Sequence, residues 1–393
     1  MKFGETFSST ELLIRSWYKK NARDLPMRRT RDPYKIWIAE VILQQTRMDQ
    51  GLPYYENFIS AFPDVASLAS AGEEKVLKLW QGLGYYNRAR NLQVAARDVE
   101  KRFGGQMPSD YEGLLSLRGV GRYTAAAIAS FCYGEGVPAV DGNVSRVIAR
   151  LYGVEEAVNS SAGEKQIYAL AQSLMNESLS TLDSPLCSPP SADLRAPLRS
   201  GSTDPREGIP PAGIFNQAMI EFGAMHCTPV SPDCEACPLR DRCVAYGSGQ
   251  VDRLPVKKRA KKPLDLWIWF YIIYVKGETV LVQRGTEDIW KSLYQFPALT
   301  SGVRASDTRM VDGWTELFAP APPPAFTLRK ISPEIKHQLS HRTLHARFIH
   351  LELARWPKEL PDGWIQISVD AVDDKPVPRL INRYLESINF SYL

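Results

Sequence analysis

Four cysteines within a seventeen-residue stretch constrain this chain more than any other feature of its sequence. The run HCTPVSPDCEACPLRDRC spaces them as Cys-x6-Cys-x2-Cys-x5-Cys, and the whole chain of 393 residues holds six cysteines. The N-terminal residues show no apolar export signal, so a disulfide framework is not expected and clustered thiols favour a metal centre. The stretch is therefore expected to close as a compact loop around metal.

Four thiolates with one central CxxC suit either tetrahedral zinc or a cubane iron–sulfur cluster. Structural zinc sites usually present two CxxC pairs separated by a longer loop, whereas this stretch has one such pair. The spacing therefore favours a 4Fe-4S cluster over zinc. Its expected ligands are Cys227, Cys234, Cys237 and Cys243.

Hydrophobic patterning divides the rest of the chain. From about residue 10 to 178 apolar residues recur at helical spacing, residues about 180–213 are rich in Pro and Ser, and strand-like alternation begins near 264. We predict a multidomain chain in which an all-α domain with the cluster loop precedes an α+β domain. The expected limits are 1–225 for the helical domain, 226–245 for the cluster loop, 246–263 for a linker and 264–393 for the last domain.

Composition narrows the function only slightly. The chain is 44% hydrophobic and 23% charged, which are ordinary globular values, and its net charge of +4 is compatible with a nucleic-acid partner without requiring one. No run of eighteen apolar residues is present. We therefore expect a soluble, cytoplasmic protein with no membrane partner.

A turn between glycines in LLSLRGVGRYTAAAIAS predicts a helix–hairpin–helix. An apolar helix ends before Gly119-Val120-Gly121, and a second helix begins at about Tyr123. The glycines allow a tight turn whose N–H groups, with the next helix N-terminus, form a phosphate-sized anion site. Such a hairpin holds a DNA backbone phosphate without reading bases, although a structural helix corner can carry the same glycines.

About twenty residues further on, Asp141 ends the apolar run VPAV just before a helix that starts with Gly142-Asn143. An aspartate in this place can be a plain N-cap. The same place should keep its carboxylate ionised, because the helix dipole and nearby N–H groups favour the charged form. Asp141 is thus a candidate anion for stabilising a cationic sugar carbon.

Taken in order, GVGRYTAAAIAS, VDGNVSRV and the four-cysteine loop resemble the endonuclease III superfamily of helix–hairpin–helix DNA glycosylases. The resemblance covers residues about 10–245 closely and 264–370 more loosely. It implies double-stranded DNA as partner, a base flipped out of the duplex, and Asp141 as the active-site aspartate. It also implies that Asn143 and Tyr123 position the reacting groups and water by hydrogen bonds.

Tyr123 and Glu40 indicate the branch of this superfamily. Members that also cut the strand resemble one another in a lysine directly after GVGR, because an amine must attack C1′ to form a Schiff base, and this chain has Tyr123 there. The segment LPMRRTRDPYKIWIAEVILQQTRM is similar to adenine glycosylases, with Glu40 as general acid towards adenine N7. Its apolar neighbours should raise the Glu40 pKa, although a solvated helix face is the alternative.

The resemblance implies a monofunctional glycosylase that excises adenine opposite 8-oxoguanine or guanine, leaving an abasic site in base excision repair. It places Arg28, Gln217 and Glu221 near the adenine pocket, and Gln45 and Tyr85 in the base stack. Two positions depart from the family: Met27 replaces the usual Trp, and Arg118 replaces the usual Pro of the hairpin.

The last domain resembles the Nudix-like domain of adenine glycosylases through the run WKSLYQFP. The catalytic Nudix box is absent, so we expect no pyrophosphate hydrolysis. The family's Phe-Ser-His loop, which recognises 8-oxoguanine, stands here as Leu339-Ser340-His341. His337, His341 and His345 recur every four residues, but the following alternation predicts a strand, so we interpret them as loop and strand residues and not as a metal face.

Two other functions fit part of the pattern. A bifunctional glycosylase/lyase for oxidised pyrimidines would be trapped on DNA by borohydride, which Tyr123 argues against. A non-enzymatic DNA-binding module would use the hairpin and the cluster for docking alone. In either case the chain is expected to act as a monomer.

Overall fold

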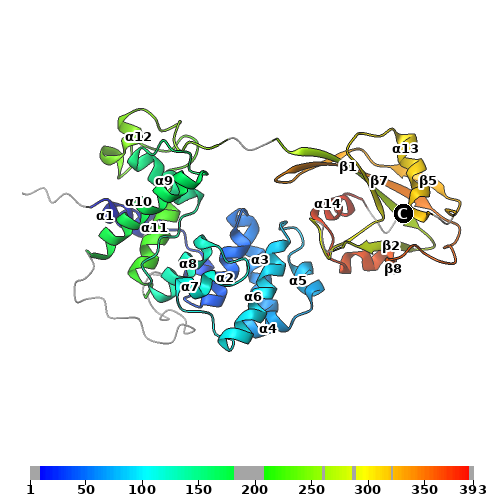
Figure 1. Ribbon diagram of the computed structural model, residues 1–393, viewed down its shortest axis with the longest axis horizontal. Helices are drawn as coiled ribbons and strands as arrows, with labels where there is room; N and C mark the ends of the chain where they lie inside the picture. The colour runs from blue at the N-terminus through cyan, green and yellow to red at the C-terminus, as the bar shows by residue number, and fades with distance from the viewer. Residues whose placement is uncertain (1–8, 181–207, 259–261, 286–288, 320–321, 389–393) are drawn as a thin grey trace, which may run out of the picture. The chain divides into compact units, whose positions relative to one another are not determined.

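The computed structural model describes residues 9–180, 208–258, 262–285, 289–319 and 322–388 (Figure 1). They form two compact units: the first comprises residues 1–70 and 91–259, and the second residues 71–90 and 260–393. Most of the predicted Pro/Ser-rich insertion, residues 181–207, lies outside the described residues. The expected domain limits at 225, 245 and 263 stay a prediction.

The first unit is helical where described, as the periodicity predicts. Its described helices range from four to twenty residues. They are α1 (Thr10–Asn21), α2 (Pro33–Leu43), α3 (Met48–Ala61), α4 (Val65–Ser70), α7 (Tyr111–Leu115), α8 (Arg122–Tyr133), α9 (Gly142–Tyr152), α10 (Ser161–Ser180), α11 (Pro211–Met225) and α12 (Val244–Gly247); α6 (Asn87–Phe103) begins in the second unit and continues into the first.

Local capping explains several of these helix ends. The Asp32 side chain accepts from the N–H groups of Tyr34 and Lys35 at the start of α2, and Pro33 supplies the fixed φ that suits a first helical position. Gly134 and Gly153 end α8 and α9 in the left-handed conformation, which glycine adopts without steric cost. These signals fix α2, α8 and α9, the three helices that carry most of the site.

The predicted helix–hairpin–helix is present as α7 and α8. Gly119 in the connecting turn has a φ of +79°, and a Cβ there would lie 2.6 Å from the Asn91 Cβ, so the turn requires glycine. Gly121 is the N-cap residue of α8, with no side-chain cap. Helix α8 begins at Arg122, one residue before the expected start.

One core of the first unit lies between α1, α9, α10 and α11, which Figure 1 shows side by side. Phe215, Met219 and Phe222 of α11 are its central aromatic and sulfur-containing side chains, each at most 2% exposed. Cys227 and Cys237 pack against this core. The cluster loop is thereby fixed to the helices that carry the site.

The second unit is built on two sheets, which confirms the change of pattern near residue 264. The first sheet has the strand order β4-β1-β7-β5, with β6 pairing on β7, and the second has the order β3-β2-β8. The strands are β1 (Leu264–Tyr274), β2 (Glu278–Gln283), β3 (Tyr294–Gln295), β4 (Ala298–Ser301), β5 (Thr327–Ile331), β6 (Ile335–Gln338), β7 (Arg342–Glu352) and β8 (Trp364–Ser368).

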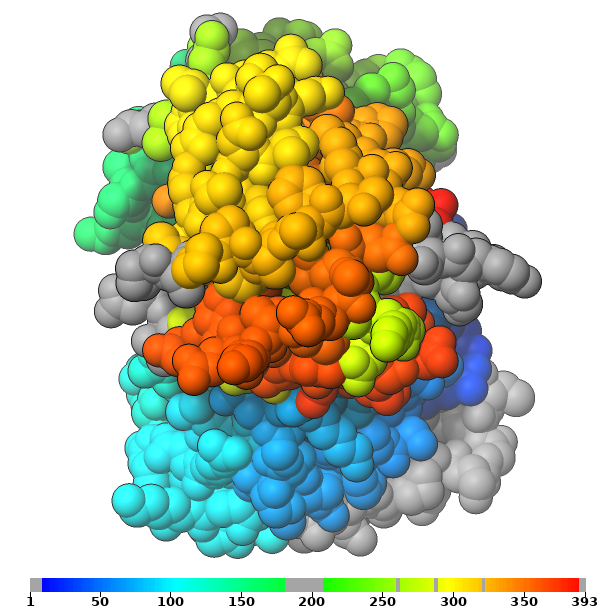
Figure 2. Space-filling model, turned by 90° about the vertical axis from the view of Figure 1, so that its right-hand side faces the viewer, coloured from blue at the N-terminus to red at the C-terminus, as the bar shows by residue number. Residues whose placement is uncertain are grey.

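Strands β1 and β7 run parallel and form the centre of the larger sheet (Figure 1). Their apolar faces pack on Trp314 and Phe318, next to α13 (Asp307–Asp312). The unit also contains α5 (Glu73–Leu79) and the C-terminal α14 (Arg379–Ser387). In Figure 2 the surface of this unit that faces the viewer is mainly yellow to orange-red, so it comes from the chain after β2.

None of the described helices has the length and apolar character needed to cross a membrane.

Candidate active site

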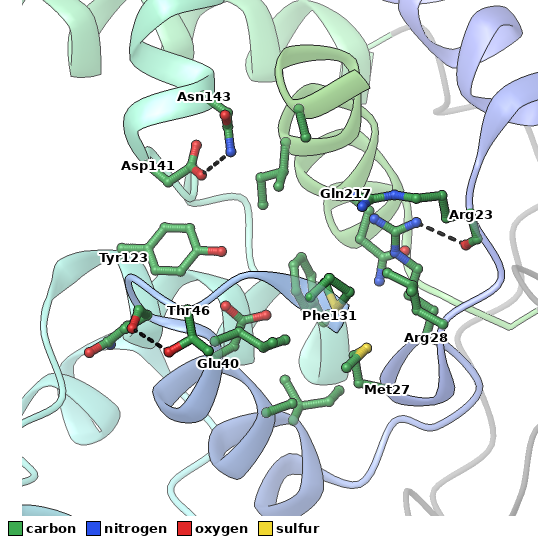
Figure 3. Close-up of a pocket in the computed structure, with 18 of the residues that line it drawn as sticks. Arg23, Met27, Arg28, Glu40, Thr46, Tyr123, Phe131, Asp141, Asn143 and Gln217 are labelled. Atoms are coloured by element: carbon green, nitrogen blue, oxygen red, sulfur yellow. Dashed lines mark hydrogen bonds between the residues drawn. The ribbon is translucent and has the colours of Figure 1, made fainter. Parts of the chain in front are cut away.

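A pocket of about 540 Å³ in the first unit brings together seven of the predicted site residues (Figure 3). Asp141 and Asn143 point into it from one side, Glu40 from another, and Arg28 and Gln217 lie at its far end. A pocket of this size accommodates a small ligand such as a nucleobase with its sugar. The predicted residues that line it are Arg28, Glu40, Gln45, Tyr123, Asp141, Asn143 and Gln217.

Glu40 lies near the end of α2, on the one side of that helix that opens to the pocket. Ile36, Trp37, Ile38 and Ala39 before it are buried, so its carboxyl faces the pocket from an apolar wall. Burial raises the Glu40 pKa to about 7; a hydrogen bond with Tyr123 and the charge of Arg28 oppose this rise, and Asp141 adds to it. The raised pKa agrees with the expectation from its apolar neighbours.

Asp141 is both an N-cap and a pocket residue, so the two interpretations of its sequence position do not exclude each other. One carboxylate oxygen accepts from the Val144 N–H at 2.8 Å, and the other accepts from the Asn143 side-chain amide at 2.8 Å (Figure 3). The N–H groups favour the charged form, as expected, but burial acts against them. Burial raises the Asp141 pKa above 3.8, and these hydrogen bonds only reduce the rise.

Tyr123 stands in the first turn of α8 and lines the pocket between the two carboxyl groups (Figure 3). Burial, followed by the nearby charges of Glu40 and Asp141, raises its pKa well above 10, so the phenol keeps its proton. The hydroxyl can therefore donate to Glu40. No amine occupies this position.

Glu221, predicted near the adenine pocket, bonds two residues that line the pocket without lining it itself. It is fully buried on α11, where its carboxylate accepts from Arg23 Nη2 and Arg28 Nη2, each at 2.7 Å, and from the Arg23 backbone N–H at 2.9 Å. Burial alone would raise the Glu221 pKa, but these hydrogen bonds outweigh it and lower the pKa to about 2. Glu221 thus holds the two arginines that line the pocket.

Gln217 also has a fixed orientation, because the buried Tyr18 hydroxyl donates to its Oε1 at 2.8 Å. Its amide group can then donate towards the pocket. Met27 lines the same pocket and is 9% exposed, so the residue that replaces the family's Trp still packs there.

Gln45 and Tyr85, the two residues expected in the base stack, share an unusual backbone. Gln45 has a φ of +58° and Tyr85 a φ of +48°, a region that non-glycine residues rarely adopt. Gln45 lines the pocket, and Tyr85 is 54% exposed in the second unit. The neighbouring Tyr86 is buried, as a core residue should be.

The Leu339-Ser340-His341 loop is the turn between β6 and β7, as its interpretation as a loop predicts. Ser340 and His341 are exposed, and the Ser340 hydroxyl lies 3.1 Å from that of Tyr85, a residue of the same unit. His341 donates no side-chain hydrogen bond among the described residues. Both side chains are thus accessible to a ligand.

The four cysteines lie in the loop after α11. Burial and, less strongly, the nearness of the other three thiols raise the pKa of Cys237 to about 11. In the described part of the chain no three His, Cys, Asp or Glu side chains lie close enough to hold a single metal ion. The fit to a cluster rests on the soft thiol donor set that this one loop supplies.

Two arginines that the sequence analysis missed join this loop to α9. Arg150 Nη1 lies 3.5 Å from Cys227 Sγ, and Arg146 donates to the Cys227 carbonyl at 2.7 Å and to Asn143 Oδ1 at 2.9 Å. Hydrogen bonds thereby run from Asp141 through Asn143 and Arg146 to a cluster ligand. Their four-residue spacing on the helix that Asp141 caps was the available signal.

Comparison with known proteins agrees with this geometry. Residues 38–176 match the HhH-GPD superfamily of base excision DNA repair proteins, residues 227–243 match the iron–sulfur binding domain of endonuclease III, and residues 268–387 match the NUDIX domain. The cysteine loop is therefore an iron–sulfur binding domain, as the spacing predicts.

Relatives named adenine DNA glycosylase come from distant organisms. An adenine DNA glycosylase of Buchnera aphidicola (Schizaphis graminum) is 32% identical over 74% of this chain and 75% of its own length. The adenine DNA glycosylase of Mycolicibacterium smegmatis is 34% identical over 80% of this chain and 94% of its own length. The human enzyme is 39% identical over 61% of this chain and 40% of its own length. The chain belongs to the adenine DNA glycosylase family of base excision repair enzymes.

Proposed function

We propose that this enzyme excises adenine paired with 8-oxoguanine or guanine in duplex DNA and stops at the abasic site, as a cytoplasmic monomer. The observation that carries the proposal is the pair of carboxyl groups in one pocket, with the Glu40 pKa near 7 and Asp141 hydrogen-bonded through both oxygens. A carboxyl group that holds its proton near neutral pH can act as a general acid.

In this proposal, Glu40 gives its proton to N7 of the flipped adenine, so that the bond between C1′ and N9 can break and neutral adenine can leave. Positive charge then develops at C1′, and the Asp141 carboxylate stabilises it either electrostatically or through a transient bond to C1′. Water finally adds its oxygen to C1′ and returns a proton to Glu40. Tyr123 and Asn143 orient the two carboxyl groups during these steps.

The proposal limits the reaction to base removal. Strand cleavage by this superfamily's lyases needs an amine to form a Schiff base with C1′, and Tyr123 supplies none. The proton that burial keeps on the Tyr123 hydroxyl further supports a hydrogen-bonding role over a nucleophilic one.

Adenine is recognised, in this proposal, at the end of the pocket where Arg28 and Gln217 lie. The Glu221 carboxylate and the Tyr18 hydroxyl hold these two side chains in place, and fixed donors discriminate well among bases because a wrong partner leaves them unpaired. Gln45 and Tyr85 fill the stack, Gly119 and Gly121 hold a phosphate, and Leu339, Ser340 and His341 read the opposite base.

The four cysteines would hold the 4Fe-4S cluster, which cross-links the loop onto the α1–α9–α10–α11 core. This chain contributes Arg150, whose Nη1 lies 3.5 Å from the Cys227 sulfur, so a positive charge adjoins one of the proposed ligands. The proposed role of the cluster is architectural.

The test uses the full chain with duplexes that carry adenine opposite 8-oxoguanine, adenine opposite guanine, or thymine glycol. Free base and strand breaks are scored with and without alkali. The expected result is adenine release from the first two duplexes, with breaks only after alkali. Borohydride trapping of a covalent complex between the protein and DNA, or release from the thymine glycol duplex alone, would overturn the proposal.

A further inference from the structure

The hairpin that carries the Leu339–His341 loop is joined to the neighbouring strand at one place. The His341 carbonyl accepts from the N–H of Leu264, the first residue of β1, at 3.0 Å, and the Leu339 N–H donates to the Arg342 carbonyl at 2.8 Å. The loop backbone is thus fixed at the ends of β1 and β7. Backbone pairing also holds β6 and β1 against β7.

His345, four residues beyond His341 on β7, adds a side-chain link to this backbone pairing. Its Nδ1 lies 2.9 Å from Glu334, directly before β6, and its Nε2 lies 3.0 Å from Asp265 of β1. The ring also stacks on Trp267 of β1, with centroids 4.7 Å apart and planes 14° apart. One imidazole therefore links the three chain segments that frame the loop.

Both contacts at once require a charged ring. A neutral imidazole donates from only one nitrogen, so its other lone pair would face a carboxylate; the imidazolium donates from both. The two hydrogen bonds, the one to Glu334 first, raise the His345 pKa above 6.5. His345 is only 11% exposed, which limits competition from water.

Other charged groups around the ring do not remove the preference of His345 for the charged imidazolium form. Lys336 of β6 stands opposite His345 in register, and Arg304 lies near Glu334, where both cations lower the Glu334 pKa and so keep it ionised. On β7 the neighbouring Arg347 is paired with Asp307, and Thr343 is uncharged. The two carboxylates are the groups in contact with the imidazole.

We propose that protonated His345 is a positioning residue for recognition of the base opposite adenine, because it ties β6 and β1 to β7 at the foot of the Ser340–His341 loop. This inference rests on the proposed function of that loop. His345 does not touch the base; it restricts the loop, so that Ser340 and His341 are presented in one arrangement.

The test compares full-length wild type, His345→Gln and Asp265→Asn between pH 6 and 8.5. The readout is the ratio of the rates of adenine release opposite 8-oxoguanine and opposite guanine. Because both duplexes use the same pocket, the titration of Glu40 cancels in this ratio. His337→Gln, on the same hairpin but without a carboxylate contact, is the matched control.

We expect the His345→Gln ratio to be about tenfold below that of wild type at pH 6, the size of one charge-assisted hydrogen bond. The wild-type ratio should approach that of the variant as the pH rises, because the imidazolium is present only below its raised pKa. The ratio for Asp265→Asn, which changes a half-exposed side chain, should lie between those of wild type and His345→Gln.

A His345→Gln ratio equal to that of wild type at every pH would overturn the inference, as would an equal loss in His337→Gln. These outcomes differ from failure of the proposed function, in which wild type itself would release no adenine or show no preference for 8-oxoguanine.

Discussion

Two glutamates of the first unit, Glu40 on α2 and Glu221 on α11, have different surroundings and opposite pKa shifts. Glu40 faces the pocket from an apolar wall with one phenol as hydrogen-bond donor, and its pKa rises to about 7. Glu221 is fully buried, but two arginines donate to it and its pKa falls to about 2. Burial raises both pKa values; the presence or absence of paired cations decides the net direction.

Glu40 and Glu221 therefore suit two different roles of a carboxyl group. A proton donor needs a carboxyl that is costly to ionise, whereas a support for arginines needs one that is always ionised. Exchanging or removing either group should therefore have effects of a different kind: on rate at Glu40, and on stability at Glu221.

The largest expected effect is on catalysis, from Glu40→Gln. Glutamine keeps the size of the side chain but cannot transfer a proton, so adenine release under single-turnover conditions should fall about 10²- to 10⁴-fold. Duplex binding should stay within about twofold, because no charge at a phosphate contact changes. Glu56→Gln on the exposed face of α3 is the control, and a loss below tenfold at Glu40 would contradict its role as acid.

Glu221→Gln should act on stability. Removing one partner of a buried pair leaves the arginines without their carboxylate, and we expect a loss of about 3 kcal/mol in the free energy of unfolding at pH 7, at the low end because Arg23 is one-third exposed. Urea denaturation followed by tryptophan fluorescence measures it. Asp24→Asn, which breaks an exposed pair with Arg29, should leave the unfolding midpoint unchanged.

The sign of the pH effect at Glu221 follows from its lowered pKa. The folded value is about 2 and the unfolded value ~4.3, so the stabilisation is present above ~4.3 and is lost as the pH falls towards 2. Wild type should therefore lose its advantage over Glu221→Gln on acidification. A constant difference between the two from pH 7 to 3 would contradict this.

The sequence could predict the direction of the Glu40 pKa shift but not that of Glu221, for a physical reason. The burial of Glu40 is a local property of α2, whose apolar neighbours are adjacent in the chain. The charge state of Glu221 depends on Arg23 and Arg28, which lie 198 and 193 positions away. Only the packing of α11 against the turn before α2 brings them together.

In the fold, too, features set by neighbouring residues can be predicted from the sequence, and features set by distant residues cannot. The hairpin, the caps of α2 and α9, and strands such as β1 and β7 follow from local pattern. The parallel pairing of β1 with β7 does not, because alternation carries no information about a strand's partner. At Asp141 the local argument predicted the cap but did not include burial, which outweighs the N–H groups in the net direction of the pKa.

The raised pKa of Glu40 should also determine how the rate of catalysis depends on pH. Because Glu40 must be protonated and its pKa is about 7, the single-turnover rate should be level below pH 6 and fall about tenfold per unit well above pH 7. The residual rate of Glu40→Gln should lack this fall, whereas Glu56→Gln should retain it. A wild-type rate that is constant from pH 6 to 8.5 would show that another group limits the reaction.

The smallest expected effect concerns Tyr123, whose hydroxyl donates a hydrogen bond to Glu40. The hydrogen bond from Tyr123 lowers the Glu40 pKa, so Tyr123→Phe should raise it and move the alkaline fall of the rate to higher pH, while the plateau drops only a few-fold. Tyr34→Phe removes a buried hydroxyl that donates to the Phe62 carbonyl outside the pocket, and it should leave the profile in place. A shift to lower pH in Tyr123→Phe would mean that the phenol stabilises the protonated form of Glu40, and the contrast with Glu221 would then rest on burial and the arginines alone.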